Sequence, residues 1–542
     1  MKKFIFLIML LMIFIQPFIY VKATGDEIKY ISTSVGENET EMGINYHTNT
    51  STSYVKYSTN ADLSNSIQVE ANSVFWSYSS DEENLGFDAR YINRVNLTNL
   101  NLDTTYYFQV VTKNKVSDIY QFTTARGFSM TTFAFVTDTQ ASDAGYIKVN
   151  NLTKKLLENK PDIRFMLMTG DIVDRGGNEG FWNNFFNRVE VINRLPLATI
   201  PGNHEYYLTS SGTYISPEAY NQFFNNPQNG INERINSSYY FKYNDILFIM
   251  IDTIKDELYE EQRAWFERVI TTNLSRYIIV GVHAGCFTGG NYTHDASRMT
   301  REWLKTFEKF SVDLVISGHE HMFGYTLPLF NGKESKDFGV THLIGPSGAE
   351  KQYNVKEDYK KYFVDYQNIR TAGCVIEALG NKLSITLYDE SGNEQKNFML
   401  NAKRLDKVSN KDVDNLIDTL RINHNQELHQ AKLEWSADAY GHIRSIKVRE
   451  ANGLNISKFI STPKVLSIDL GSCWENNHYR YELEITLLNG EVIDKVLELN
   501  LKTEPIKPVP PKTNNCQTGS FVQIINYLVI AFIFLFINKR QK

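Results

Sequence analysis

Residues 165–174 have the sequence FMLMTGDIVD, in which a short apolar run is followed by threonine, glycine and a segment with two carboxylates. Four bulky apolar residues in a row are typical of a strand buried on both faces, as in α/β sheets. In such sheets, ligands gather in the crevice at the carboxyl ends of the strands. We therefore expect Asp171 and Asp174 to lie at the edge of a sheet where a functional site forms.

The same arrangement of an apolar run followed by polar residues occurs at four other places. The apolar runs are Phe133–Val136, Ala198–Ile200, Tyr277–Val282 and Leu314–Ile316. The polar motifs that follow them are Asp138-Thr139-Gln140, Gly202-Asn203-His204-Glu205, His283 and Gly318-His319-Glu320-His321. Polar groups at the ends of several strands of one sheet predict a single site on which all of them converge.

The side chains in these motifs are mainly carboxylates, amides and imidazoles, and no cysteine accompanies them. Such donors suit Mn, Fe or Zn, whereas a thiolate zinc site is not expected. Two cations about 3.5–4 Å apart can hold a phosphoryl oxygen, generate hydroxide near neutral pH and steady an in-line displacement. The motifs therefore predict a metal site, and a pair of metal ions held there could hydrolyse phosphoesters.

The order of the motifs, D followed by GD, GNH, H and GHxH, resembles the calcineurin-like metallophosphoesterase superfamily over about residues 130–400. Three flanking stretches are similar to its purple acid phosphatase-like branch: Tyr239-Tyr240-Phe241, Arg301-Glu302-Trp303-Leu304 and Leu343–Ser347. The resemblance implies a central α/β metallophosphoesterase sandwich at residues 130–400.

The resemblance also implies a ligand role for each motif residue. Asp171 would bridge both metals, Asp138 and His321 would belong to the first site, and the second site would hold Asn203, His283 and His319. Gln140 stands where many members of the superfamily have histidine, and its amide oxygen is a weaker ligand, so the metal of the first site stays open. In an extended segment Glu320 would point away from both neighbouring imidazoles.

Four more residues are candidates for catalysis by the same resemblance. His204 is similar to the family histidine that contacts the phosphate, and Asp174 is expected to orient it. Arg175 resembles an arginine that grips phosphate in protein phosphatases, with a surface salt bridge as the alternative. His294 resembles a substrate-orienting histidine, with a loop residue of no role as the alternative. Because Asp174 stands where purple acid phosphatases have their iron-binding tyrosine, we expect no coloured phenolate–iron bond.

Flanking domains are predicted on both sides of the central region of this 542-residue chain. Residues 27–126 have short alternating stretches typical of an all-β domain, and Leu100–Tyr106 resembles a fibronectin type III turn. Tyr106 is expected to hydrogen-bond back to that turn. Residues 409–421 are predicted to form a helical connector, and residues 428–502 a second immunoglobulin- or fibronectin-like sandwich.

The two ends of the sequence predict export and anchoring. Residues 1–23 have the cations, apolar run and small residues of a secretory signal peptide, with an uncleaved anchor as the alternative. Residues 503–515 are a proline-rich spacer, and residues 521–537 are predicted to be a transmembrane segment followed by cations. We expect a cell-surface protein held in the plasma membrane; attachment to the cell wall is the alternative.

The net charge of −6 argues against a nucleic-acid-binding surface, although nucleotides could be substrates. The leading hypothesis is a surface-anchored dinuclear-metal enzyme that hydrolyses small phosphomonoesters. Phosphodiesterase or nucleotidase activity is an alternative, because the same metal pair serves both reactions. An adhesin with an inactive phosphatase-like core is an alternative of another class, and the complete set of predicted ligands argues against it.

Overall fold

The computed structural model describes residues 26–78, 86–126, 130–206, 216–273, 275–335, 339–356, 362–367, 369–403, 414, 417–435, 443–450, 455–456, 467–487 and 492–502. The predicted signal peptide, proline-rich spacer and transmembrane segment lie outside these residues, as does much of the predicted connector. Among the helices that are described, none combines the length and the apolar character needed to cross a bilayer.

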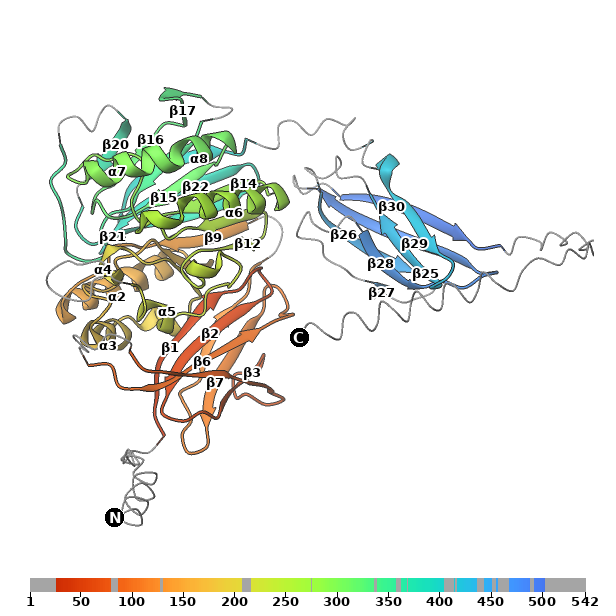
Figure 1. The fold of residues 1–542 in the computed structure, drawn as a ribbon, viewed down its shortest axis with the longest axis horizontal. Coiled ribbons are helices and arrows are strands. Elements are labelled where there is room, and N and C mark those ends of the chain that lie inside the picture. The colour runs from red at the N-terminus through yellow and green to blue at the C-terminus, as the bar shows by residue number, and fades with distance from the viewer. Residues whose placement is uncertain are drawn as a thin grey trace, which may run out of the picture. The chain divides into compact units, whose positions relative to one another are not determined.

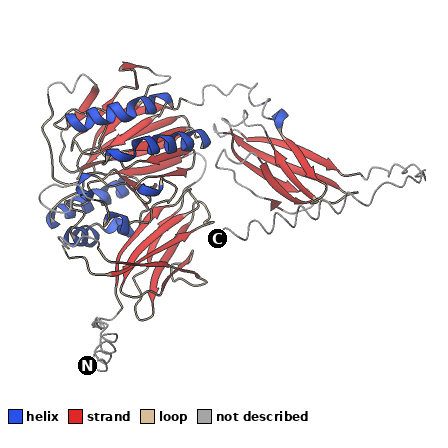
Figure 2. Cartoon of the chain, in the orientation of Figure 1, coloured by secondary structure: helices blue, strands red, loops and turns tan. Residues whose placement is uncertain are grey.

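The central region contains two β-sheets that pack face to face, with helices on their outer faces (Figure 1 and Figure 2). The first sheet runs in the order β23-β22-β21-β9-β10-β11 and then continues into the N-terminal region. Its strands here are β9 (Met130–Phe135), β10 (Ile163–Met168), β11 (Leu197–Thr199), β21 (Ala372–Leu379), β22 (Lys382–Asp389) and β23 (Glu394–Asn401).

The second sheet has seven strands in the order β12-β13-β14-β15-β19-β16-β20. Its strands are β12 (Tyr239–Tyr243), β13 (Ile246–Met250), β14 (Tyr277–Gly281), β15 (Leu314–Ser317), β16 (Phe323–Thr326), β19 (Thr341–Ile344) and β20 (Phe363–Gln367). A two-stranded ribbon, β17 (Leu329–Phe330) and β18 (Lys333–Glu334), lies next in the chain after β16.

Helices cover both sheets because successive residues of the inner strands alternate between two cores. Phe133 and Phe135 of β9 belong to the core between the sheets, whereas Ala134 belongs to the core that includes helix residues such as Leu152. The helices are α2 (Asp143–Asn159), α3 (Glu179–Arg188), α4 (Asn203–Tyr206), α5 (Tyr220–Phe223), α6 (Tyr259–Thr272), α7 (Thr293–Met299) and α8 (Lys305–Lys309). Short turns are η1 (Glu190–Asn193), η2 (Asn232–Arg234), η3 (Asp256–Leu258) and the π-helical η4 (Thr300–Leu304).

The N-terminal region is all-β, as predicted, but it shares a sheet with the central region. β1 pairs in parallel with β11 through Ser34 and Leu197, and the ten-stranded sheet continues in the order β1-β2-β6-β5. The strands are β1 (Ile28–Val35), β2 (Met42–Thr48), β5 (Asn72–Trp76) and β6 (Arg90–Leu97), facing a second sheet of β3 (Ser53–Ser58), β4 (Ile67–Glu70), β7 (Thr105–Thr112) and β8 (Tyr120–Thr123). The Asn101 amide donates to the Tyr106 hydroxyl at 2.9 Å, which confirms the predicted turn contact.

The region predicted to be a second β-sandwich contains strands in two sheets. Three strands form the first, namely β24 (Arg421–Asn425), β25 (Gln430–Glu434) and β28 (Ser467–Ser472). Four strands form the second, namely β26 (Ile443–Glu450), β27 (Asn455–Ile456), β29 (His478–Leu487) and β30 (Val492–Asn500). Along β25 the buried Ala431 and Leu433 alternate with the exposed Gln430 and Lys432, as expected for a sheet with one apolar face.

A buried ion pair joins the N-terminal strands to the first helix layer. Arg90 of β6 donates from Nη2 to Oε2 of Glu179 on α3 at 2.8 Å, and both side chains are less than a tenth exposed. The Tyr30 hydroxyl of β1 donates to Oε1 of the same carboxylate at 2.6 Å. Removing one partner of such a pair leaves the other charge buried without compensation.

Arg90→Ala should therefore lower the free energy of unfolding by about 3–5 kcal/mol, measured by urea denaturation. The matched control is Lys29→Ala. Lys29 pairs with Glu27 at 2.7 Å, but both side chains are more than 40% exposed, so its loss should cost less than about 1 kcal/mol. Equal losses in the two variants would show that the Arg90 pair contributes nothing beyond an ordinary surface pair.

Candidate metal centre

The seven residues predicted to bind metal meet at the carboxyl ends of the central strands. Two groups of donor atoms each lie within 4.8 Å of one another: Asp171, His283 and His319 form one group, and Asp138, Asp171 and His321 form the other. Asn203 adjoins the first group, because its Oδ1 lies 2.9 Å from His283 Nε2. Asp171 belongs to both groups, which is the position required of a bridging ligand.

The first of these groups has lone pairs that face one another. His283 donates from Nδ1 to the Thr169 carbonyl at 2.8 Å, so in the neutral imidazole Nε2 carries a lone pair. That Nε2 lies 3.1 Å from His319 Nδ1 and 2.9 Å from the Asn203 oxygen. Acceptors at these distances repel unless a proton or a cation lies among them, so this donor set fits a metal ion.

Gln140 adjoins the second group and also fits a metal. Its Nε2 donates to Asp171 Oδ2 at 3.0 Å and lies 3.3 Å from His321 Nε2. Its Oε1 is buried and has no hydrogen-bond partner within the described part of the chain. The two ends of an amide differ only by a rotation, which would turn the unpaired oxygen toward the same two ligand atoms.

The backbone at the predicted ligands is held in an uncommon conformation. Asp138, Asp171, His319 and His321 all have positive φ, at 51°, 51°, 71° and 50°. Non-glycine residues adopt this left-handed region at a cost, and such strain gathers at functional sites. The expectation of an extended segment at His319 and His321 is therefore wrong, but the two imidazoles lie in different donor groups, as the resemblance implied.

Two motif glycines allow the loops to approach the ligand carboxylates. A Cβ on Gly202 would lie 2.2 Å from Asp171 Oδ1, and a Cβ on Gly318 would lie 2.2 Å from Asp138 Oδ2. Any side chain at either position would displace a predicted metal ligand. Steric clash with these carboxylates therefore explains why the GNH and GHxH motifs begin with glycine.

Glu205, the last residue of the Gly202–Glu205 motif, connects the segment at residue 202 to residues 171–173 through hydrogen bonds. Its carboxylate accepts backbone N–H bonds of 2.7–3.0 Å from Gly202, Asp171, Ile172 and Val173. Burial raises the pKa of Glu205 to about 7, with the nearby Asp171 charge adding to the effect. Glu205 therefore fixes the backbone at Asp171 without belonging to either donor group.

The site concentrates buried charge. Burial raises the pKa of Asp138 to about 8, while Asp171 has its pKa held far below the usual range because His283 and His204 outweigh the effect of burial. Burial opposes protonation of His283, but the adjacent Asp171 carboxylate still raises its pKa to about 9. The negative charge of the two buried carboxylates needs compensation, which protonated imidazoles or bound cations would supply.

His204 lies beside the bridging position. Its Nε2 is 3.9 Å from Asp171 Oδ2, and its Nδ1 donates to the backbone carbonyl of Asp174 at 2.6 Å. The Asp174 carboxylate is more distant, at 3.7 Å from Nδ1. Asp174 was expected to orient His204, and the shorter of its two contacts with that imidazole comes from the main chain.

The Asp174 carboxylate pairs with cations. Lys351 Nζ lies 3.0 Å from its Oδ1, and Arg175 Nε lies 3.7 Å from its Oδ2. Arg175 is thus placed at the edge of the site, next to Asp174. Neither donor group includes Asp174.

His294 differs from its prediction as a substrate-orienting residue. Its side chain is 93% exposed, and its Nδ1 lies 4.0 Å from Asp295 Oδ1. The structure brings the neighbouring Asp295 to the site instead, with Oδ2 3.3 Å from His319 Nε2. On α7 it is thus Asp295, next to the predicted His294, that contacts a site imidazole.

Three further residues near the site were not predicted from the sequence. The Tyr292 ring lies 3.9 Å from the His319 ring, and the Tyr353 ring lies 4.4 Å from the His321 ring. Lys351 reaches Asp174 from the same loop as Tyr353. These residues are on irregular loops, and no spacing or motif in the sequence marks them.

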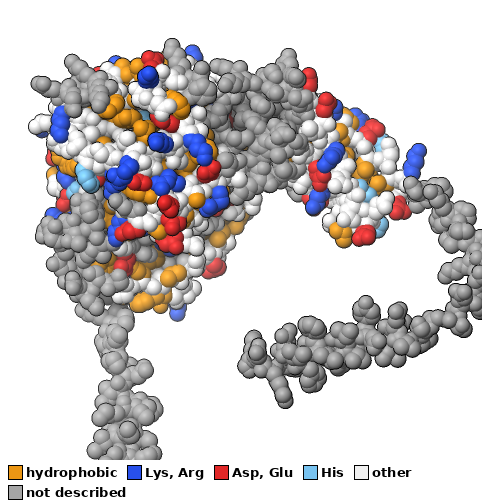
Figure 3. Space-filling model, turned by 45° about the horizontal axis from the view of Figure 1, so that its top comes forward, with side chains coloured by type: hydrophobic (Ala, Val, Ile, Leu, Met, Phe, Trp, Pro, Cys, Tyr) orange, Lys and Arg blue, Asp and Glu red, His pale blue; other side chains and the backbone are white. Residues whose placement is uncertain are grey.

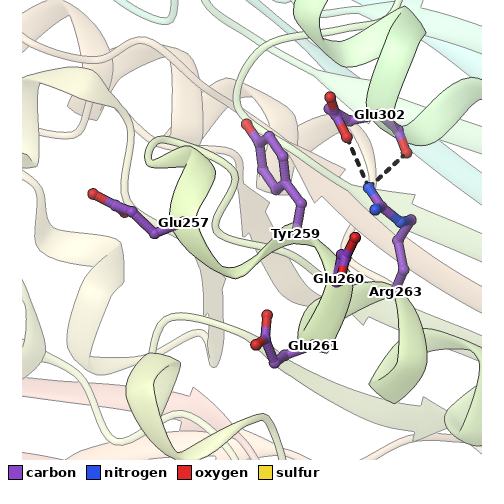
Figure 4. A pocket seen from close by; sticks show the side chains of 6 residues that line it. All are labelled: Glu257, Tyr259, Glu260, Glu261, Arg263 and Glu302. Carbon is purple, nitrogen blue, oxygen red and sulfur yellow. Dashed lines mark hydrogen bonds and ion pairs between the residues drawn. The ribbon is translucent and has the colours of Figure 1, made fainter.

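A separate hollow of about 290 Å³ lies over α6 and is lined by acidic side chains and Arg263 (Figure 4). Arg263 Nη1 lies 2.9 Å from Glu302 Oε2 there. The hollow shares no residue with the two donor groups. On the face shown in Figure 3, acidic and basic side chains are interspersed.

Comparison with known families agrees with this geometry. The family model for calcineurin-like phosphoesterases matches residues 131–323, and the model for the purple acid phosphatase N-terminal domain matches residues 28–124. The chain therefore carries a calcineurin-like metallophosphoesterase domain together with a purple acid phosphatase N-terminal domain. This family binds a dinuclear metal centre, which the two donor groups could hold.

Individual relatives are distant. Purple acid phosphatase 21 of Arabidopsis thaliana is 21% identical over 268 residues, which cover 48% of this chain and 59% of the relative. The Bacillus subtilis protein YvnB is 24% identical over 225 residues, which cover 39% of this chain and 17% of the relative. The chain thus matches less than two thirds of the length of either protein.

Among solved structures, the purple acid phosphatase PPD1 from yellow lupin (Lupinus luteus) seeds is similar with a TM-score of 0.59. The match covers 69% of this chain and 74% of that chain at 15% identity, which shows a shared fold.

Because Asp171 belongs to both donor groups, Asp171→Ala should reduce bound metal from two ions per chain to less than one, measured by elemental analysis after dialysis. The control is Glu261→Ala, which removes an exposed carboxylate from the acidic hollow on α6. That variant should keep both ions. Two ions in Asp171→Ala, or a loss in Glu261→Ala, would place the metal elsewhere.

Proposed function

We propose that this protein hydrolyses phosphomonoesters at the centre built around Asp171. The observation that carries the proposal is the sharing of one carboxylate by two donor groups, with the His204 imidazole next to it. Two bound cations at such a centre supply Lewis acidity and a nucleophile at neutral pH. A phosphoryl group has several oxygens, so it can bind both cations at the same time.

The chain's own residues have separate roles in this proposal. His204 is held through Nδ1 by the Asp174 carbonyl, so Nε2 is the atom that faces the reaction centre. A protonated Nε2 can donate a hydrogen bond to a phosphoryl oxygen or a proton to the leaving oxygen. Lys351 and Arg175, both beside Asp174, add positive charge near the same place and would favour an anionic substrate.

Substrate class is tested with purified protein loaded with Mn, Fe or Zn and assayed on matched phosphomonoesters and phosphodiesters. We expect a higher kcat/KM on the monoesters. Preference for the diesters, or for nucleotides, would support the phosphodiesterase or nucleotidase alternative. No hydrolysis of any ester by the metal-loaded protein would favour a binding protein with an inactive core.

His204→Ala should lower kcat by roughly 10²–10⁴, the usual contribution of general acid–base catalysis, while metal content stays at the wild-type value. The physical reason is that His204 lies beside the bridging carboxylate without belonging to either donor group. Steady-state kinetics and metal analysis on the same preparation check both parts. Loss of one ion would make His204 a ligand.

We also propose that the enzyme is exported and held at the cell surface. The support is the signal-like sequence of residues 1–23, the proline-rich residues 503–515 and the apolar residues 521–537 followed by cations. Protease added to intact cells should cut between about residues 503 and 515 and release soluble, active enzyme. Complete protection in intact cells, with cleavage after lysis, would contradict this location.

A further inference from the structure

Asp295 makes a contact with one of the site imidazoles that none of the motifs indicates. It lies on α7, with a side chain 28% exposed, and its Oδ2 is 3.3 Å from His319 Nε2. The opposite nitrogen of the same ring, Nδ1, lies 3.1 Å from Nε2 of His283, which is itself 2.9 Å from the Asn203 oxygen. His319 thus lies between a carboxylate on one side and the donor group on the other.

The second oxygen of Asp295 is held in place by the chain. Arg298, on the same helix, brings Nη2 to 3.2 Å from Asp295 Oδ1. Arg298 also donates from Nη1 to the Ile254 carbonyl at 3.2 Å, and its side chain is only 12% exposed. Arg298 therefore holds the Asp295 carboxylate on the side away from His319, so the carboxylate is a well-ordered partner for the imidazole.

We propose that Asp295 is a positioning residue that orients His319 and fixes its tautomer for the metal ion shared with His283 and Asn203. A carboxylate can only accept at Nε2, so the proton of the neutral ring stays on that nitrogen. The lone pair is then on Nδ1, which points into the donor group. The inference rests on the two-metal site of the proposed function, but not on the reaction.

Comparison with His283 shows why the identity of this partner matters. His283 is oriented in the same way, but by the Thr169 main-chain carbonyl at 2.8 Å. A carbonyl is neutral, whereas a carboxylate adds negative charge that makes the ring a stronger donor to a cation. Loss of such an outer partner typically weakens metal affinity about 10–100-fold.

The test is titration of metal-free protein with Zn²⁺ against a competing chelator, which gives both dissociation constants without any assay of activity. Asp295→Ala should weaken the binding of one ion by about 10–100-fold and leave the other within about threefold of wild type. Asp295→Asn keeps an acceptor of the same shape but removes the charge. The Zn²⁺ affinity of Asp295→Asn should therefore fall by less than that of Asp295→Ala.

His294→Ala is the matched control, because it changes an exposed neighbour on the same turn of α7. Both of its affinities should equal those of wild type. Wild-type affinities in Asp295→Ala, or equal weakening of both ions, would overturn the inference. Thermal unfolding of the metal-free variants checks that they fold. If Asp295→Ala does not fold, Asp295→Asn decides the question, and wild-type Zn²⁺ affinities in that variant would overturn the inference. If wild type binds two ions but hydrolyses no ester, the proposed function fails while this inference stands.

Discussion

Four backbone N–H groups converge on the carboxylate of Glu205, and the geometry of the whole metal centre depends on that convergence. Asp171 has a left-handed backbone, so the chain after β10 leaves the sheet abruptly and its next amides lose their strand partners. Ile172 and Val173 are fully buried, and water cannot satisfy their N–H groups. The carboxylate satisfies them, and the strained turn keeps Asp171 where both donor groups share it.

The N-terminal domain supports the same part of the molecule. β1 pairs with β11, the short strand that precedes α4, which begins with Asn203 and His204. On the other side, β11 pairs with β10, which leads to Asp171. The strand that delivers the GNH motif is thus held by a partner from each domain, while the Arg90–Glu179 pair joins the domains through α3. The domain therefore stabilises the site from outside it.

Three of the four site imidazoles have a second partner that sets their orientation. The partner is a main-chain carbonyl for His283 and His204, from Thr169 and Asp174, and a carboxylate for His319, from Asp295. Carbonyl partners follow from the path of the backbone, so a substitution at Thr169 or Asp174 need not remove them. Asp295 alone among these three partners is a side chain and can be tested directly by substitution.

The sequence alone determined the strand-end motifs, the all-β N-terminal region and the meeting of most predicted ligands, since a ligand that directly follows a buried strand is placed by the sheet itself. It also predicted the Tyr106 turn contact, which involves residues close together in the chain. Only the tertiary structure decided the left-handed turns at His319 and His321, the role of the Asp174 carbonyl and the choice of Asp295 over His294. It also joined β1 to β11. These features depend on how irregular loops and separate domains pack, and such packing has no periodicity that a sequence pattern can express.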